Sequence, residues 1–183
     1  MAYKIMIDAG HGGPDNGARY QNRLEKEDNL AMALAVGNIL EQYGFWVEYT
    51  RKTDVYESPY EKAQKGNKGR VDLFVSIHRN SSPMPNQYNG VETLIYENGS
   101  FAEKVAENIN RQMEWVGYRK IRVMKRPDLI VLNSTTMPAV LIEVGFINSD
   151  IDNTLFDTLF YETAFAIADG ITMSIYPENY VWS

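Results

Sequence analysis

The chain contains no cysteine. This absence excludes disulfide bonds, zinc sites built from thiolates and a cysteine nucleophile. Histidine is almost as rare, because only His11 and His78 occur among 183 residues. Any chemistry that uses imidazole must therefore depend on these two side chains.

Basic residues are fewer than acidic ones, and the formal net charge is −6. This balance gives no support for binding nucleic acid through a basic surface. No stretch has the length and apolar character of a membrane span. The segment Met1–Lys4 leads directly into an apolar run, without the basic and then apolar pattern of a signal peptide. We expect no nucleic-acid partner, no membrane partner and no export signal in this sequence.

The length and a hydrophobic content of 44% fit one domain with a substantial core. There is no repeat, low-complexity tract or linker. We assign residues 1–176 to one domain and residues 177–183 to a C-terminal tail, because Pro177 ends the last predicted helix. We expect a monomer, and a separate wall-binding domain could follow outside this chain.

Three short apolar runs each lead to a residue that is capable of acid–base or metal chemistry. Runs of this kind are typical of strands that are buried on both faces of a parallel sheet. The carboxyl ends of parallel strands meet at one edge, where open α/β sheets bind ligands. The runs and the residues that follow them are Lys4–Gly10 with His11, Leu73–Ile77 with His78, and Val140–Ile142 with Glu143.

Helical and strand patterns alternate along the chain. This alternation predicts a single α/β domain with a mostly parallel, twisted sheet of about six strands, flanked by helices on both faces. Predicted helices are about Leu24–Tyr43, Pro59–Lys68, Ser100–Trp115 and a terminal helical region capped by Ser149 or Asp150. Further strands are predicted at Phe45–Thr50, Val91–Tyr96, Ile121–Lys125 and Leu129–Leu132.

The stretch Gly10–Ala18 is too rich in glycine to be helix or strand. It has neither the lysine followed by Ser or Thr of a phosphate loop nor the dinucleotide-binding spacing. We therefore expect its glycines to allow close approach of the backbone around His11.

Two imidazoles and one carboxylate form an open zinc site that keeps a position for water, and zinc lowers the pKa of that water to about 7. The residues alone leave the carboxylate undecided. Glu143 could be the third ligand or a general base beside the metal. Glu25 could be a ligand, or it could form a capping box with Asn22, which the pattern alone slightly favours. Ordinary structural roles for both histidines are the alternative to a metal site.

Several blocks, in order from about Lys4 to Ile175, together resemble the zinc-dependent N-acetylmuramoyl-L-alanine amidases. The blocks are Ile7–Gly13, Gly17-Ala18, Glu25-Lys26 with Asn29-Leu30, Thr50-Arg51, Ser76–His78 with Asn80, Gly90–Glu92 and Pro138–Phe146.

The resemblance implies a single α/β domain that hydrolyses the amide between N-acetylmuramic acid and L-alanine in peptidoglycan. It implies one zinc ion per chain, with His11, Glu25 and His78 as ligands and Glu143 as the catalytic glutamate. That shifts Glu25 from cap to ligand. The short segment between His78 and Glu143 lacks the long inserted helix of self-inhibited relatives, so we expect an open site.

One segment departs from the family pattern, since relatives often have an arginine and an Ala-Asn pair where this chain has Tyr60 and Gly66-Asn67. The change affects local packing more than chemistry. Two alternatives to an amidase are an inactive wall-binding module and a zinc carboxypeptidase that acts on stem peptides. The absent signal peptide favours an enzyme made in the cytoplasm that reaches the wall on release, as in phage or mother-cell lysis; otherwise it is secreted.

Overall fold

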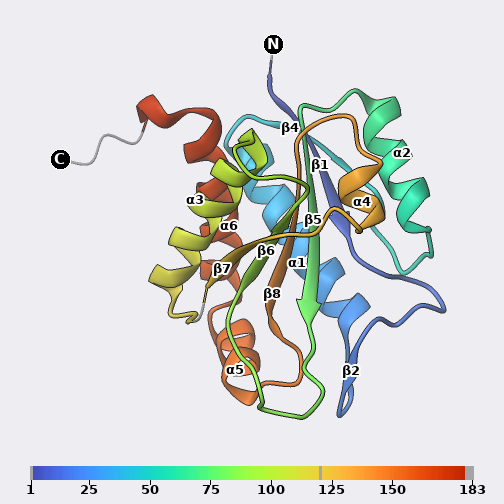
Figure 1. Ribbon diagram of the computed structural model, residues 1–183, viewed down its shortest axis with the longest axis vertical. Coiled ribbons are helices and arrows are strands. Elements are labelled where there is room, and N and C mark those ends of the chain that lie inside the picture. Colours follow the sequence, from blue (N-terminus) through green and yellow to red (C-terminus); the bar gives the residue numbers. More distant parts are fainter. Residues whose placement is uncertain (1, 120, 180–183) are drawn as a thin grey trace.

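The computed structural model describes residues 2–119 and 121–179, which form one α/β domain (Figure 1). Its six-stranded sheet has the order β4-β1-β5-β8-β6-β7. All neighbours are parallel except β6 and β8, so the expected mostly parallel sheet is confirmed. The strands are β1 (Lys4–Ala9), β4 (Trp46–Tyr49), β5 (Leu73–Asn80), β6 (Glu92–Ile95), β7 (Arg122–Lys125) and β8 (Ala139–Phe146).

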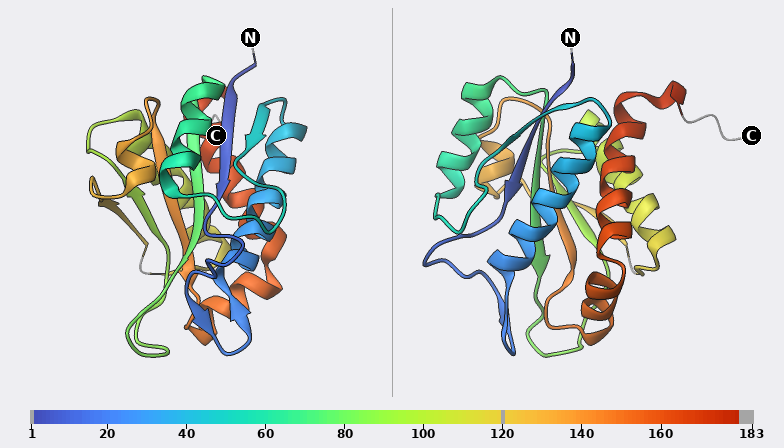
Figure 2. Two further views of the ribbon diagram at one scale, coloured as in Figure 1. Left: turned by 90° about the vertical axis from the view of Figure 1, so that its right-hand side faces the viewer. Right: turned by 180° about the vertical axis from the view of Figure 1, so that it is seen from behind.

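Helices cover both faces of this sheet, as expected (Figure 2). The larger layer holds α1 (Glu25–Gln42), α3 (Phe101–Val116) and α6 (Phe160–Ile175), which share one core cluster with Ile5 and Ile7 of β1. The smaller layer holds α2 (Pro59–Gly69) and α4 (Ile130–Asn133). Helix α5 (Asp150–Thr158) follows β8 at the carboxyl edge.

The smaller layer rests on apolar side chains that include Met6, Phe74 and Leu141. Because side chains alternate along a strand, the residue two positions later lies on the same face and closer to the carboxyl edge. For β1 and β8 these residues are Asp8 and Glu143. The apolar support of α2 and α4 thus gives way to polar residues where the parallel strands end, and this edge carries the candidate site.

The structure corrects two expectations about secondary structure. The predicted strand Leu129–Leu132 is wrong, because Leu129 precedes the short helix α4. A four-residue apolar run fits either element, and here Val131 and Leu132 pack on the sheet from a helical turn. The terminal helical region is divided at Leu159 into α5 and α6.

The helix starts agree in part with the sequence patterns. Ser100 and Ser149 cap α3 and α5 as predicted, each accepting a backbone hydrogen bond three residues on. The Asn22–Glu25 capping box is wrong, because α1 follows Leu24 without a side-chain cap. Instead, a hairpin that the sequence did not predict, β2 (Arg19–Tyr20) with β3 (Arg23–Leu24), leads into the helix.

The end of the described chain is a 3₁₀ turn at Pro177–Asn179. The rest of the predicted tail, residues 180–183, lies outside the described residues, so the domain boundary stays a prediction. Among the described helices, none combines the length and the apolarity that crossing a bilayer requires.

Candidate metal centre

The structure brings His11, Glu25 and His78 together at the carboxyl edge of the sheet. One ligand atom from each lies within 4.8 Å of the others. Glu25 lies between the imidazoles, 3.2 Å from His11 Nε2 and 2.9 Å from His78 Nδ1. Glu25 is buried, whereas Glu27 is exposed, so the first turn of α1 presents only Glu25 to the histidines.

The carboxylate of Glu25 is held by several donors besides the histidines. It accepts hydrogen bonds from the backbone N–H groups of Ala18 at 2.8 Å and Arg79 at 3.2 Å, and from Asn29 Nδ2 at 3.2 Å. Burial disfavours its ionised form, but the histidines outweigh this effect and hold the pKa of Glu25 well below its usual range. Glu25 is therefore a fixed carboxylate, and it does not cap the helix.

Glu25 has the converse effect on His11. Burial alone would lower the imidazole pKa, but hydrogen bonding and charge from Glu25, assisted by Asp15, raise the pKa of His11 to about 9. Asp15 Oδ2 lies 2.8 Å from His11 Nδ1 and leaves Nε2 directed toward Glu25. A carboxylate behind a metal-binding histidine fixes its orientation and raises its basicity. Sequence reasoning missed Asp15, although its position four residues after His11 was visible.

The glycine-rich loop allows the close approach that we expected. A Cβ atom at Gly10 would lie 2.2 Å from His78 Cε1, and one at Gly17 would lie 2.5 Å from Glu25 Oε2. His11 itself has a φ of 59°, a conformation that is uncommon for a residue other than glycine. Any larger residue at Gly10 or Gly17 would occupy the space of the candidate ligands.

Buried cations fix the backbone that carries His11. Arg51 donates to the carbonyls of Ala9 at 3.1 Å and Gly10 at 2.9 Å. Lys62 donates to Ala9 O and forms an ion pair of 3.0 Å with Asp8, which is fully buried. Arg51, Lys62 and Asp8 thus fix the backbone between β1 and the loop that carries His11.

Glu143 lies outside the group of three. Its Cα pairs with that of His78 across β5 and β8, and its Oε2 atom is buried without a hydrogen bond from the described residues. Burial raises the pKa of Glu143 to about 7, and the nearby charges of Glu25 and Glu92 act in the same direction, while His78 opposes them. A carboxyl group with this pKa can exchange protons near neutral pH.

The donor set fits a divalent transition metal with one coordination position left for water or substrate. Glu143 lies on the strand next to that of His78, and its Oε2 atom has no hydrogen-bond partner among the described residues. Its carboxyl group can therefore accept or donate a proton beside the metal centre. This combination on an open α/β sheet is typical of metal-dependent hydrolases.

Comparison with known proteins places the chain within that class. Residues 5–173 match the family described as N-acetylmuramoyl-L-alanine amidase. The endolysin of Bacillus phage SPP1 is 35% identical over 178 residues, which cover 93% of this chain and 65% of that protein. The chain therefore spans slightly less than two thirds of that relative.

Solved structures agree. The catalytic domain of CwlV, an N-acetylmuramoyl-L-alanine amidase from Bacillus (Paenibacillus) polymyxa var. colistinus, matches with a TM-score of 0.83 and 35% identity, covering 94% of this chain and 98% of that one. The N-acetylmuramoyl-L-alanine amidase from Clostridium difficile 630 matches with a TM-score of 0.85 and 29% identity over 98% of this chain and 99% of that one. The chain belongs to the N-acetylmuramoyl-L-alanine amidase family, a class of peptidoglycan hydrolases.

Proposed function

We propose that this chain binds one zinc ion through His11, Glu25 and His78 and hydrolyses the amide between N-acetylmuramic acid and L-alanine in peptidoglycan. The observation that carries the proposal is the convergence of these three donors within 4.8 Å, with His78 on the strand next to that of Glu143. A zinc ion there would supply Lewis acidity and activate water at neutral pH.

The protein's own groups then divide the remaining work. Glu25 and the two imidazoles hold the metal, and Asp15 orients His11. Glu143, with a pKa of about 7, takes a proton from the attacking water and delivers it to the alanine nitrogen as the amide bond breaks. The same carboxyl group is suited to both steps because it exchanges its proton near working pH.

Mass spectrometry of digested peptidoglycan tests the bond that is cut. An amidase releases whole stem peptides with a free L-alanine amino group and leaves glycan with lactyl carboxylates. A carboxypeptidase would release single amino acids, and a binding module would release nothing. Either of those outcomes from zinc-loaded protein would overturn the proposal.

We further propose that residues 1–176 are the catalytic domain and act as a monomer, and that any wall-binding domain lies outside this chain. The matched share of the SPP1 endolysin, 65%, supports such a division. We propose that the protein is made in the cytoplasm and reaches the wall on release. Light scattering after gel filtration tests the monomer.

A further inference from the structure

A row of side chains continues from the metal centre across the sheet. His78 on β5 pairs with Glu143 on β8, Glu143 pairs with Glu92 on β6, and Glu92 pairs with Arg122 on β7. Directly paired residues lie on the same face of a sheet. The row therefore leads from a metal ligand, past the candidate acid–base residue, to an exposed guanidinium group.

Glu92 fixes Arg122 at the end of this row. Arg122 donates to Glu92 Oε1 through Nε at 2.7 Å and through Nη2, and Asn80 Nδ2 donates to Glu92 Oε2 at 2.9 Å. Both oxygens of Glu92 are thus engaged, and its side chain is only 13% exposed. Arg122 is 62% exposed, and the rest of its five N–H donors are available to a ligand.

Beside Arg122 lies a pocket of 330 Å³. Both Tyr88 and Phe146 line it, and the centroid of the half-exposed Tyr88 ring lies 6.1 Å from that of the Phe146 ring. Buried Asp152 connects Phe146 to the segment before β6. It accepts hydrogen bonds from the backbone N–H groups of Phe146 at 2.7 Å and of Gly90 at 2.9 Å. The lining residues are Tyr88, Asn89, Glu92, Ile121, Arg122 and Phe146.

We propose that this pocket is a subsite for the stem peptide and that Arg122 binds the free α-carboxylate of its second residue. The inference rests on the proposed amidase function. That residue of a stem peptide is a D-glutamate joined through its γ-carboxyl, so its α-carboxyl is either free or amidated. Arg122 selects the free form, which makes it a specificity residue.

The position of Glu143 sets the direction of the substrate. Glu143 protonates the alanine nitrogen, so the departing peptide starts at β8. The metal ligands His11 and Glu25 lie on the other side of β8, toward β1 and α1. The peptide therefore continues over β6 and β7, where the available groups are the Arg122 donors and the Tyr88 ring. Guanidinium binds a planar carboxylate with two parallel hydrogen bonds, which a primary amide cannot accept.

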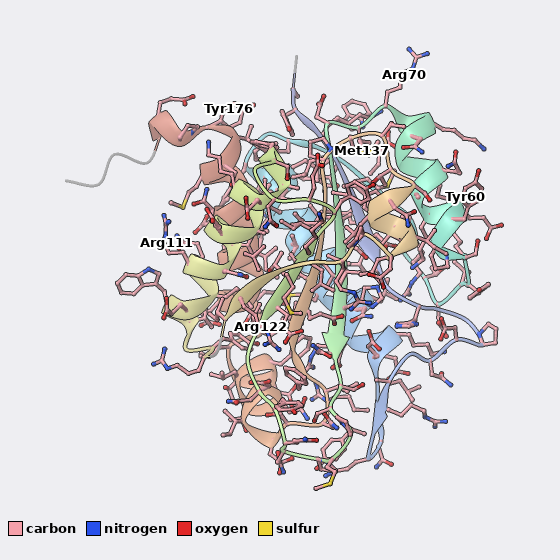
Figure 3. All side chains as sticks on the ribbon, in the orientation of Figure 1. Tyr60, Arg70, Arg111, Arg122, Met137 and Tyr176 are labelled. Atoms are coloured by element: carbon pink, nitrogen blue, oxygen red, sulfur yellow. The ribbon has the colours of Figure 1, made fainter. Side chains whose placement is uncertain are left out.

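The test compares two muropeptides with full stems that differ only in whether the second residue carries the free α-carboxylate or its amide. The wild type is expected to have a KM about tenfold lower for the free acid, with similar kcat for both. Arg122→Gln should remove this preference, so that the KM values of the free-acid and amidated substrates become equal. Arg122→Lys should restore only part of it. Arg111→Gln, on the outer side of α3, is the matched control and should behave as wild type (Figure 3).

Calorimetric binding of the released stem peptides measures the same preference without hydrolysis. Tighter binding of the free-acid peptide to the wild type than to Arg122→Gln supports the subsite even if no muropeptide is cleaved, in which case only the amidase proposal fails. The role of Arg122 would be overturned if the wild type and Arg122→Gln showed the same ratio of affinities for the free-acid and amidated stems. It would also be overturned if the wild type preferred the amidated stem.

Discussion

Glu25 and Glu143 are both close to His78, yet their surroundings favour opposite protonation states. Glu25 accepts hydrogen bonds from two imidazoles, two backbone amides and Asn29, which keeps it ionised. Glu143 is buried with one oxygen unpaired, which raises its pKa to about 7. This separation of the two pKa values supports the proposed roles of Glu25 as ligand and Glu143 as acid–base residue.

At the position of Glu143, replacement by glutamine is expected to leave zinc bound and the fold intact, because the amide keeps the shape of the side chain. Turnover should fall by roughly 10²- to 10⁴-fold, since the group can no longer take up or release a proton. Zinc content and muropeptide release are measured on the same sample, with exposed Glu114→Gln as control. Full zinc with a near wild-type rate would refute the base, and lost zinc would make Glu143 a ligand.

The first turn of α1 offers a matched pair for the ligand assignment. Glu25→Ala is expected to lose the metal, because it removes the carboxylate between the two imidazoles. Glu27→Ala should keep full occupancy, since Glu27 is exposed on another side of the helix. Elemental analysis after gel filtration checks both variants. Full zinc in Glu25→Ala would show that the ligand set is different.

At the scale of elements, one buried ion pair joins β1 to α2. Asp8 accepts hydrogen bonds from Ser76 and Thr50, both at 2.6 Å, and pairs with Lys62. Burial opposes ionisation of Asp8, but Lys62 and the two hydroxyl groups prevail and lower its pKa. The Asp8 side chain thereby connects β1 to β5, to the end of β4 and to α2, next to the loop that carries His11.

Asp8→Asn is expected to destabilise the domain by about 3 to 5 kcal/mol, because it leaves Lys62 buried without its partner. Since the folded pKa of Asp8 is lowered, its contribution is fully present above the unfolded value near 3.8 and is lost as pH falls through the folded pKa. Urea unfolding should give a constant difference from wild type between about pH 5 and 7 that narrows below about pH 4.

Asp128→Asn is the control for this experiment, because the Asp128 side chain is 61% exposed and pairs with exposed Arg126. Its unfolding midpoint should equal that of the wild type. An Asp8→Asn variant as stable as the wild type at pH 7 would contradict the structural role of the pair.

The sequence allowed the strand that leads to His11 and the strands that carry His78 and Glu143 to be predicted, because fully apolar runs are a local signal of buried strands. It did not reveal that β6 runs antiparallel to β8, since strand direction depends on how the chain connects elements in space. The short hairpin at Arg19–Leu24 was missed for a related reason. Two-residue strands have no periodicity to detect.

The candidate ligands were predicted as far as residue patterns allow. The cleft position of Glu25 could not be separated from a helix cap, because both place a carboxylate in the first turn. The roles that we propose for Asp15 and Arg122 could not be inferred either. Each depends on a contact with a side chain or a paired strand that only the folded chain provides.

On the scale of the whole molecule, the two helical layers cover different parts of the sheet. The larger helical layer covers one face of the sheet, and α2 and α4 cover the apolar part of the other (Figure 1). The row from His78 to Arg122 lies on that second face, nearer to the carboxyl ends of β5 and β8. In the described part of the chain between His78 and Glu143, α3 belongs to the larger layer and α4 packs on the apolar cluster. The open site expected from the sequence stays a prediction.

The two core clusters are built from apolar side chains that do not involve the three candidate ligands. Removal of zinc by a chelator is therefore expected to abolish activity while the domain stays folded, with an unchanged circular dichroism spectrum. Without metal, Glu25 still contacts both imidazoles, so the three side chains stay together in the folded domain.

Restoring zinc at about 100 times its dissociation constant should stabilise the fold by about 2.7 kcal/mol, because only the native state gathers the ligands. For a domain of this size that corresponds to a rise in melting temperature of about 5 to 10 °C. Scanning calorimetry with and without zinc measures the shift. Glu25→Ala should show none, and Glu27→Ala should show all of it. An active metal-free protein, or equal shifts in both variants, would contradict the site.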